Sequence, residues 1–388
     1  MTKCVHQLLV EGGLLDKPAE MLRLFNFNKR VLLFVCAMLV ALDLFIGFYI
    51  DWRFAEPACC RLPCDDAAAV QLWLRQVEKA EGFKIVFLGD SAVHGLAAGS
   101  GFDSLPAAVS RCLKKRLPQK EIKVFNLALE GCGPAETFLL FNALSGARVD
   151  LVIYDLNIAW FSRRKTLDHP NLLALTDNYP QDFNPAEIAP DILTTKEQVR
   201  GEAYVKESLS KNWKLYRYRI LLNYWLFGKP IRNELPLAMQ NPEVLLTNSD
   251  NVYAEIKELR TPWREKDWPT DARRGRLGEF NISGANHQWK FYLRFIELLE
   301  EKGTKVVFYT PPRNFELLDK TKSINYPLYL RNSKLAVEAA GRRGIPVLNY
   351  DRSVESEHFT DIIHTTARGN EILAGKMADD LISKGLLD

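Results

Sequence analysis

The sequence lacks the compositional marks of several protein classes. Its 388 residues carry a formal net charge of only +3, and no segment repeats or falls to low complexity. A charge this close to balance does not favour nucleic acid as a partner, and the missing repeats argue against a repeat array. Apolar residues make up 47% of the chain and charged residues 26%. These proportions are typical of a globular protein with one large domain or two ordinary ones.

Cysteine is too scattered to indicate a zinc site. The seven cysteines stand at positions 4, 36, 59, 60, 64, 112 and 132. Cys60 and Cys64 have a ligand-like spacing, but no second pair follows them. We therefore expect no metal and no other cofactor.

One long apolar run stands near the N-terminus. Residues 31–50 read VLLFVCAMLVALDLFIGFYI, in which only Asp43 is charged. The run is long enough to cross a bilayer as a helix, provided that Asp43 is protonated, paired or turned to a partner helix. The alternative is a buried core helix. A cleaved signal peptide is less favoured, because the leading region is long and no small-x-small site follows closely. We predict a transmembrane signal anchor.

The charges around this run predict its orientation. Arg23, Lys29 and Arg30 precede it, and Asp51 follows it. Positive charge on the N-terminal side predicts a cytoplasmic tail over residues 1–30 and an extracytoplasmic remainder, periplasmic or at the cell surface. Disulfides are permitted there, although the spacing leaves their connectivity open. The lipid bilayer is thus one predicted partner.

The rest of the chain alternates between strand and helix patterns. After a linker and helix over 51–82, strands are predicted at 84–88, 122–127, 149–156, 304–310 and 346–350, and helices at 65–80, 103–117, 134–144, 286–302, 332–343 and 368–383. Nearly continuous apolar strands are typical of a parallel sheet covered on both faces. With right-handed crossovers, residues 83–388 are predicted to form a three-layer α/β/α sandwich of about five parallel strands.

An insertion at about 161–284 interrupts this alternation. Within it, residues 211–229 (KNWKLYRYRILLNYWLFGK) mix cations with aromatic side chains. One interpretation is an interfacial helix at the membrane surface. The preferred one is an insertion helix that packs an apolar stripe, including Leu221 and Trp225, on the main domain.

Polar groups follow several of the predicted strands. Ser91 comes after the first strand, and Asp361-x-x-His364 lies after the fifth. In parallel sheets the carboxyl ends of the strands form the ligand site. A serine hydroxyl needs a base to become nucleophilic. His364 can be that base, and Asp361 can fix its tautomer.

The same edge offers donors for an oxyanion. Gly131 follows the second strand and Asn157 the third. The backbone N–H groups of Ser91 and Gly131 and the side-chain amide of Asn157 can stabilise the charge that develops on an attacked carbonyl oxygen.

These blocks resemble those of the SGNH (GDSL-type) hydrolases and acyltransferases. The matching residues are Gly89-Asp90-Ser91, Asn126-Leu-Ala-Leu-Glu-Gly131, Asn157 within YDLN, and Asp361-Ile-Ile-His364. The resemblance covers residues 83–160 and 285–385 and implies a flavodoxin-like fold. It also implies that Ser91 is the nucleophile, His364 the base and Asp361 its orienting partner, with Gly131 and Asn157 in the oxyanion hole. One block departs from the family, since the usual Gly-x-Asn-Asp is here Asp155-Leu-Asn157-Ile.

The anchor and the insertion resemble a subset of that family. These are membrane-anchored envelope proteins, such as the SGNH proteins of alginate O-acetylation and of D-alanyl transfer. The resemblance implies an acylated glycan or a small acyl ester as substrate, and other membrane proteins of an acylation system as partners.

Three further side chains are candidates for lining the substrate site. His94 follows the nucleophile, Trp160 follows Asn157, and Arg313 follows the fourth strand. Each has an ordinary alternative: a helix-start histidine, core packing for Trp160, and a surface cation for Arg313.

The sequence therefore predicts a membrane-anchored extracytoplasmic serine esterase or O-acyltransferase. Hydrolysis and transfer share the acyl-enzyme, and the sequence leaves open which of them occurs. Two alternatives remain: a non-catalytic domain that binds glycan or a partner within a membrane acylation complex, and a lipase or phospholipase.

Overall fold

A five-stranded parallel sheet forms the centre of the protein. The computed structural model describes residues 29–162, 167–175, 209, 213–219, 221–222, 258–268 and 276–388. The strands are β1 (Phe83–Leu88), β2 (Ile122–Asn126), β3 (Leu151–Asp155), β4 (Val306–Thr310) and β5 (Val347–Asn349), in the order β2-β1-β3-β4-β5. Every neighbouring pair is parallel. This is the flavodoxin-like order, and it confirms the predicted fold class.

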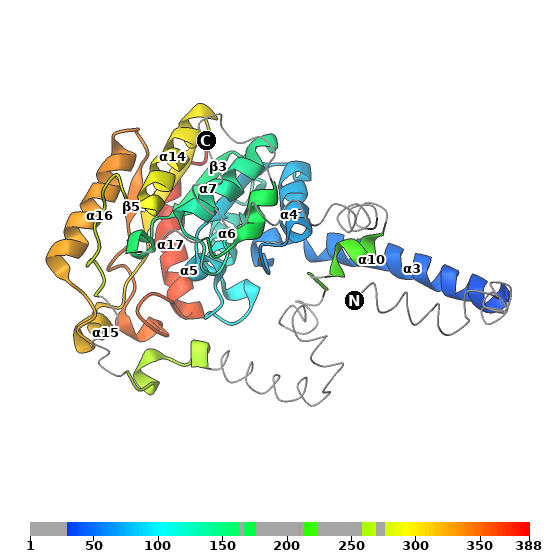
Figure 1. Cartoon of the computed structure of the whole chain (residues 1–388), viewed down its shortest axis with the longest axis horizontal. Coiled ribbons are helices and arrows are strands. Elements are labelled where there is room, and N and C mark those ends of the chain that lie inside the picture. Colours follow the sequence, from blue (N-terminus) through cyan, green and yellow to red (C-terminus); the bar gives the residue numbers. More distant parts are fainter. Residues whose placement is uncertain are drawn as a thin grey trace, which may run out of the picture.

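Helices cover both faces of the sheet (Figure 1). One face packs against α4 (Ala67–Lys79), α7 (Pro134–Ala143), α14 (His287–Glu301) and α16 (Tyr326–Gly341), and the other against α6 (Leu105–Arg116) and α17 (Ala367–Ser383). Successive side chains of β1 point to opposite faces of the sheet. Val86 and Leu88 are buried in the core on one face, and Ile85 and Phe87 in the core on the other. Strands that are buried on both faces explain the nearly continuous apolar runs.

Two helices differ from the prediction. The predicted helix 332–343 begins earlier, because the side chain of Asn325 accepts a hydrogen bond from the backbone N–H of Leu328 at 3.4 Å and caps α16. A short helix, α15 (Phe315–Lys320), was not predicted. Asn314 caps it by accepting from the N–H of Leu317 at 3.2 Å. α15 places the loop after β4 against the loop before α17.

The apolar run forms the helix α3 (Lys29–Arg53), which projects from the domain as a rod (Figure 1). Residues Arg30–Arg53, 24 in all, are long and apolar enough to cross a membrane by length and composition. Ile46 and Ile50 are buried in the core on one sheet face, whereas Leu33 and Phe34 are exposed. The structure thus shows an N-terminal apolar helix, suited to a signal anchor or a signal sequence, whose C-terminal part packs on the domain.

Asp43 of α3 has partners. Its carboxylate accepts hydrogen bonds from the backbone N–H groups of Lys214 at 2.6 Å and Leu215 at 3.1 Å. These residues open the short helix α10 (Lys214–Arg217), which lies beside α3 (Figure 1). Leu221, a few residues further on, is 1% exposed within the main core. The described part of the 211–229 stretch therefore contacts both the apolar helix and the domain core.

Several predictions fall outside the described residues. These are residues 1–28 of the predicted tail, most of the 161–284 insertion, and positions 211–212, 220 and 223–229 of the cation-aromatic stretch. The domain boundaries stay a prediction, as does the orientation of the chain across a membrane.

Candidate active site

Ser91 is the first residue of a short helix, α5 (Ser91–His94), which follows β1 after a turn at Gly89 and Asp90. The carboxylate of Asp90 caps this helix by accepting from the N–H of Ala92 at 2.8 Å. Gly95 ends it in the left-handed region at φ 77°. As the first helical residue, Ser91 has an N–H with no acceptor inside the helix, so this donor is available to a ligand.

Gly89 lets this turn approach the neighbouring strand. A Cβ at Gly89 would lie 2.7 Å from Cβ of Asp155 and 2.7 Å from Cγ2 of Val93. Both neighbours are buried, and Asp155 is held in β3. The Gly-Asp-Ser motif thus has a packing reason for its first residue as well as a chemical reason for its last.

The loop before α17 holds Asp361 and His364. Phe359 and Thr365 form an antiparallel bridge across its base. Within it, Asp361 Oδ1 accepts from the N–H groups of Ile363 and His364, each at 2.8 Å. Asn314 packs against the loop and donates from its side chain to the carbonyl of Asp361 at 3.2 Å. These bonds fix the backbone, and hence the direction of both functional side chains.

The structure brings the predicted nucleophile, base and orienting acid into one hydrogen-bonded chain. Ser91 Oγ lies 2.8 Å from His364 Nε2, and His364 Nδ1 lies 2.5 Å from Asp361 Oδ2. Because the carboxylate faces Nδ1, the neutral imidazole carries its proton there and donates it to Asp361. Nε2 is then the acceptor for the Ser91 hydroxyl, the arrangement that activates a serine.

Asp361 and His364 each shift the pKa of the other in favour of its charged form. Burial lowers the pKa of His364, but the charge and hydrogen bond of Asp361 outweigh it and raise the pKa above its usual value. Burial likewise raises the pKa of Asp361, but the attraction of His364 and the two backbone N–H bonds bring it below its usual value. Asp361 is therefore ionised at neutral pH and stabilises a positively charged His364.

Gly131 and Asn157 lie on the same edge of the sheet as Ser91. Gly131 is part of a turn after β2 and has φ 81°, which favours glycine. Asn157 follows β3, and its Nδ2 donates to Asp90 Oδ2 at 2.6 Å. An amide nitrogen carries two hydrogens, so a second N–H remains for an oxyanion. Whether these groups stabilise a reacting oxyanion stays a prediction.

The three further candidates have different surroundings. His94 is 3% exposed, with its Nε2 3.1 Å from the carbonyl oxygen of Leu62. Burial lowers its pKa to about 3, so its ring is neutral at physiological pH. Trp160 donates from its indole to Asp90 Oδ2 at 2.7 Å. Arg313 is 3% exposed and donates from Nη2 to Asn157 Oδ1 at 2.5 Å. His94 Nε2, the indole N–H of Trp160 and Arg313 Nη2 therefore each contact another group of the protein.

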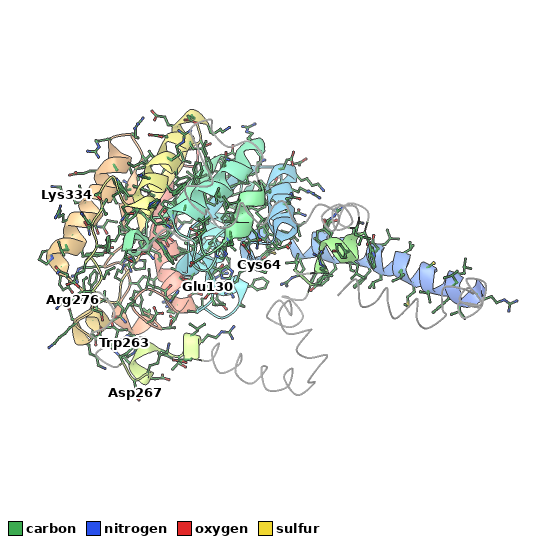
Figure 2. The ribbon with its side chains drawn as sticks, in the orientation of Figure 1. Cys64, Glu130, Trp263, Asp267, Arg276 and Lys334 are labelled. Carbon is green, nitrogen blue, oxygen red and sulfur yellow. The ribbon has the colours of Figure 1, made fainter. Side chains whose placement is uncertain are left out.

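A pocket of about 870 Å³ adjoins the loop that carries His364. Its lining comprises Ala159, Ser162, Asp267, Trp268, Arg276, Leu277, Glu279, Phe280, Thr321, Ser323, Asp361, Ile362, Ile363 and His364. Figure 2 shows Asp267 and Arg276 on the side of the domain away from α3. The pocket thus combines aromatic and aliphatic side chains with charged groups and hydroxyls beside the predicted base.

Sequence reasoning missed the buried polar groups behind the site. Asp90 links α5, Asn157 and Trp160 through its carboxylate. Asp155 is 2% exposed; burial first, and then the negative charge of Asp90, raise the pKa of its carboxyl well above its usual value. The signal was present, because Asp90 belongs to the Gly-Asp-Ser motif and Asp155 marks the departure from the family pattern.

Comparisons with known proteins reach only distant structural likenesses. No protein-family model matches the chain, and no curated protein matches it significantly. The alignment with the structure of an acetyl xylan esterase covers 77% of this chain and 100% of that protein, at 11% identity and a TM-score of 0.38. A GDSL-like lipase from Bacteroides thetaiotaomicron covers 83% of this chain and 98% of its own, at 11% identity and a TM-score of 0.33.

A third likeness is to a carbohydrate acetylesterase family member from Sinorhizobium meliloti. It covers 78% of this chain and 99% of its own, at 14% identity and a TM-score of 0.29. The chain is thus similar, at low identity, to structures of SGNH-like esterases and acylhydrolases.

Proposed function

We propose that this protein is a membrane-anchored extracytoplasmic serine esterase or O-acyltransferase that acts on acyl esters of a cell-envelope glycan. The observation that carries the proposal is the hydrogen-bonded chain from Ser91 through His364 to Asp361, with separations of 2.8 Å and 2.5 Å. A serine and a histidine are common on a surface. A serine hydroxyl aligned on an imidazole whose other nitrogen faces a half-buried carboxylate is the arrangement of nucleophilic catalysis.

The geometry supports a two-step reaction. Ser91 Oγ attacks the ester carbonyl carbon as its proton passes to His364 Nε2. The oxyanion that forms accepts hydrogen bonds from Ser91, Gly131 and Asn157. His364 then returns the proton to the leaving alkoxide as the carbon–oxygen bond breaks, which leaves an acyl-enzyme.

The second step reverses the roles. Water or a sugar hydroxyl attacks the acyl-enzyme as its proton passes to His364. Collapse of the second oxyanion releases Ser91, whose oxygen recovers the proton. Asp361 keeps its negative charge throughout and stabilises each imidazolium that forms.

Two other features support the substrate and the location. The pocket beside His364 places Trp268 and Phe280 among carboxylates and hydroxyls, a mixture suited to sugar rings with their apolar faces and polar edges. The apolar helix α3 supports attachment to a membrane, where an extracytoplasmic domain meets envelope polymers.

The test measures ester cleavage by the full chain in detergent. The full chain is needed because Ile46 and Ile50 of α3 belong to the domain core. The substrates are 4-nitrophenyl acetate, 4-nitrophenyl decanoate and an O-acetylated oligosaccharide. We expect wild type to release acetate from the first and third, and Ser91→Ala to abolish release.

The matched control is His358→Gln. His358 lies close in sequence to His364, but its Nε2 faces Glu357 at 3.6 Å. This variant should keep activity. Release that survives Ser91→Ala would overturn the proposal, and a strong preference for the decanoate would support a lipase instead.

A further inference from the structure

A buried polar chain crosses the carboxyl ends of β1, β3 and β4. Arg313, in the loop after β4, donates from Nη2 to Asn157 Oδ1 at 2.5 Å. The N–H of Ala159 donates to the same oxygen at 3.1 Å. On the other side, Asn157 Nδ2 donates to Asp90 Oδ2 at 2.6 Å. Arg313, Asn157 and Asp90 are each no more than 6% exposed.

These partners leave the Asn157 amide one orientation. Two donors, from Arg313 and Ala159, face its oxygen, and one carboxylate faces its nitrogen. A 180° flip would set the amide hydrogens against those donors and the amide oxygen against Asp90. Each buried polar group would then lose its partner, which is costly away from water.

A cation stands at one end of this chain and an acidic side chain at the other. Arg313 is the cation and Asp90 the acid, and burial first, then the charge of Asp90, raise the pKa of the neighbouring Asp155 carboxyl well above its usual value. The Arg313 cation draws electron density toward the oxygen of the amide and so strengthens its N–H groups as donors. A donor held in advance where negative charge develops lowers a barrier most effectively.

We propose that Arg313 is a positioning residue that holds the Asn157 amide with one Nδ2 hydrogen facing the oxyanion formed at Ser91. This rests on the proposed serine chemistry, and it assigns Arg313 an action through Asn157 rather than on substrate. Because Arg313 is buried and bonded to Asn157, it shapes the rate of the chemical step and leaves binding of the ground-state ester almost unchanged.

A purely structural role has a different signature. The backbone N–H of Arg313 also donates to the carbonyl of Asp351 at 3.0 Å, which ties the loop after β4 to the loop after β5. A residue needed only for this packing would lower the melting temperature when replaced. The loss of kcat on replacing such a residue would be independent of the loss on removing the Asn157 amide, so the two losses would multiply in the double variant.

The experiment is a double-mutant cycle on the full chain with 4-nitrophenyl acetate. The variants are Asn157→Ala, Arg313→Met, Arg313→Lys and the double variant Asn157→Ala/Arg313→Met, each checked for its melting temperature. We expect Arg313→Met to lower kcat by about 10- to 100-fold, somewhat less than the loss of a whole oxyanion donor, with KM within about twofold. The double variant should be no slower than Asn157→Ala alone, and Arg313→Lys should recover part of the rate.

The outcomes separate this inference from the proposed function. Losses that multiply in the double variant, or a kcat unchanged in Arg313→Met while wild type reacts through Ser91, would overturn the role of Arg313 alone. A wild type with no Ser91-dependent reaction would overturn both. If Arg313→Met fails to fold, Arg313→Lys with Asn157→Ala completes the same cycle.

Discussion

His364 Nε2 lies 2.8 Å from Ser91 Oγ, although 273 residues separate them in the sequence. Ser91 stands at the end of β1 and His364 in the loop after β5, at opposite parts of a sheet whose strands all point the same way. Parallel pairing therefore brings the two residues to one edge. The contact depends on the whole fold rather than on any local motif.

The pH dependence of activity should report the His364–Asp361 pair. The base must be neutral to act, and Asp361 raises the pKa of His364 above its usual value of about 6.5. The value of kcat/KM should therefore rise with pH, with a midpoint above about 6.5. In Asp361→Asn the charge is lost while burial still lowers the pKa, so the midpoint should fall. The rate should drop by about 10³-fold or more.

The matched control is Asp379→Asn on α17, whose carboxylate is exposed and pairs with Arg116 at 3.0 Å. Its pH profile should follow that of wild type. An unchanged midpoint in Asp361→Asn would contradict the assigned pairing.

Gly89→Ala should destabilise the fold. The added methyl would meet Asp155 and Val93 at 2.7 Å, and such overpacking costs about 1–3 kcal/mol. The control is Gly375→Ala in α17, where an added Cβ has no neighbour within 4 Å. Alanine in a helix interior should stabilise by about 0.5–1 kcal/mol. The melting temperature should thus fall in Gly89→Ala and rise in Gly375→Ala. Equal shifts in the two variants would argue against the close approach at Gly89.

Asp155→Asn should change how stability depends on pH. Because its pKa is raised in the folded state, Asp155 contributes stability that is fully present below its unfolded pKa and is lost as pH rises toward the folded value. Asparagine does not ionise, so the variant does not lose this stability as pH rises. The melting temperature of Asp155→Asn minus that of wild type should therefore increase from pH 4.5 to pH 7.5. A difference that stays flat over this range would show that Asp155 is ionised in the folded protein.

Much of this arrangement was predictable from the sequence, for physical reasons. The apolar strands and the Gly-Asp-Ser turn are local patterns, and parallel pairing then places their ends together. The start of α16 was also readable, since Asn325 and Pro327 are helix-start residues. Arg313 was different. Its burial depends on which loop groups meet after β3 and β4 pair, and no local pattern contains that information.

The contact between Asp43 and α10 should protect that segment from protease. The Asp43 side chain accepts hydrogen bonds from the backbone N–H groups of Lys214 and Leu215, and each such bond contributes about 0.5–1.5 kcal/mol. Asp43→Ala should therefore speed tryptic cleavage in the Lys214–Arg219 segment by about tenfold. Asp51→Ala, which replaces an exposed carboxylate on the same helix, is the control. Equal cleavage rates in both variants would contradict this contact.

Fluorophosphonate labelling of the full chain tests the central claim most directly, because the probe reacts only with an activated serine. We expect wild type to be labelled at Ser91, and labelling to be lost in Ser91→Ala and in His364→Ala, with His358→Gln labelled like wild type. Labelling that persists in His364→Ala, or a folded wild type that takes no label, would contradict the account of Ser91 as a nucleophile activated by His364.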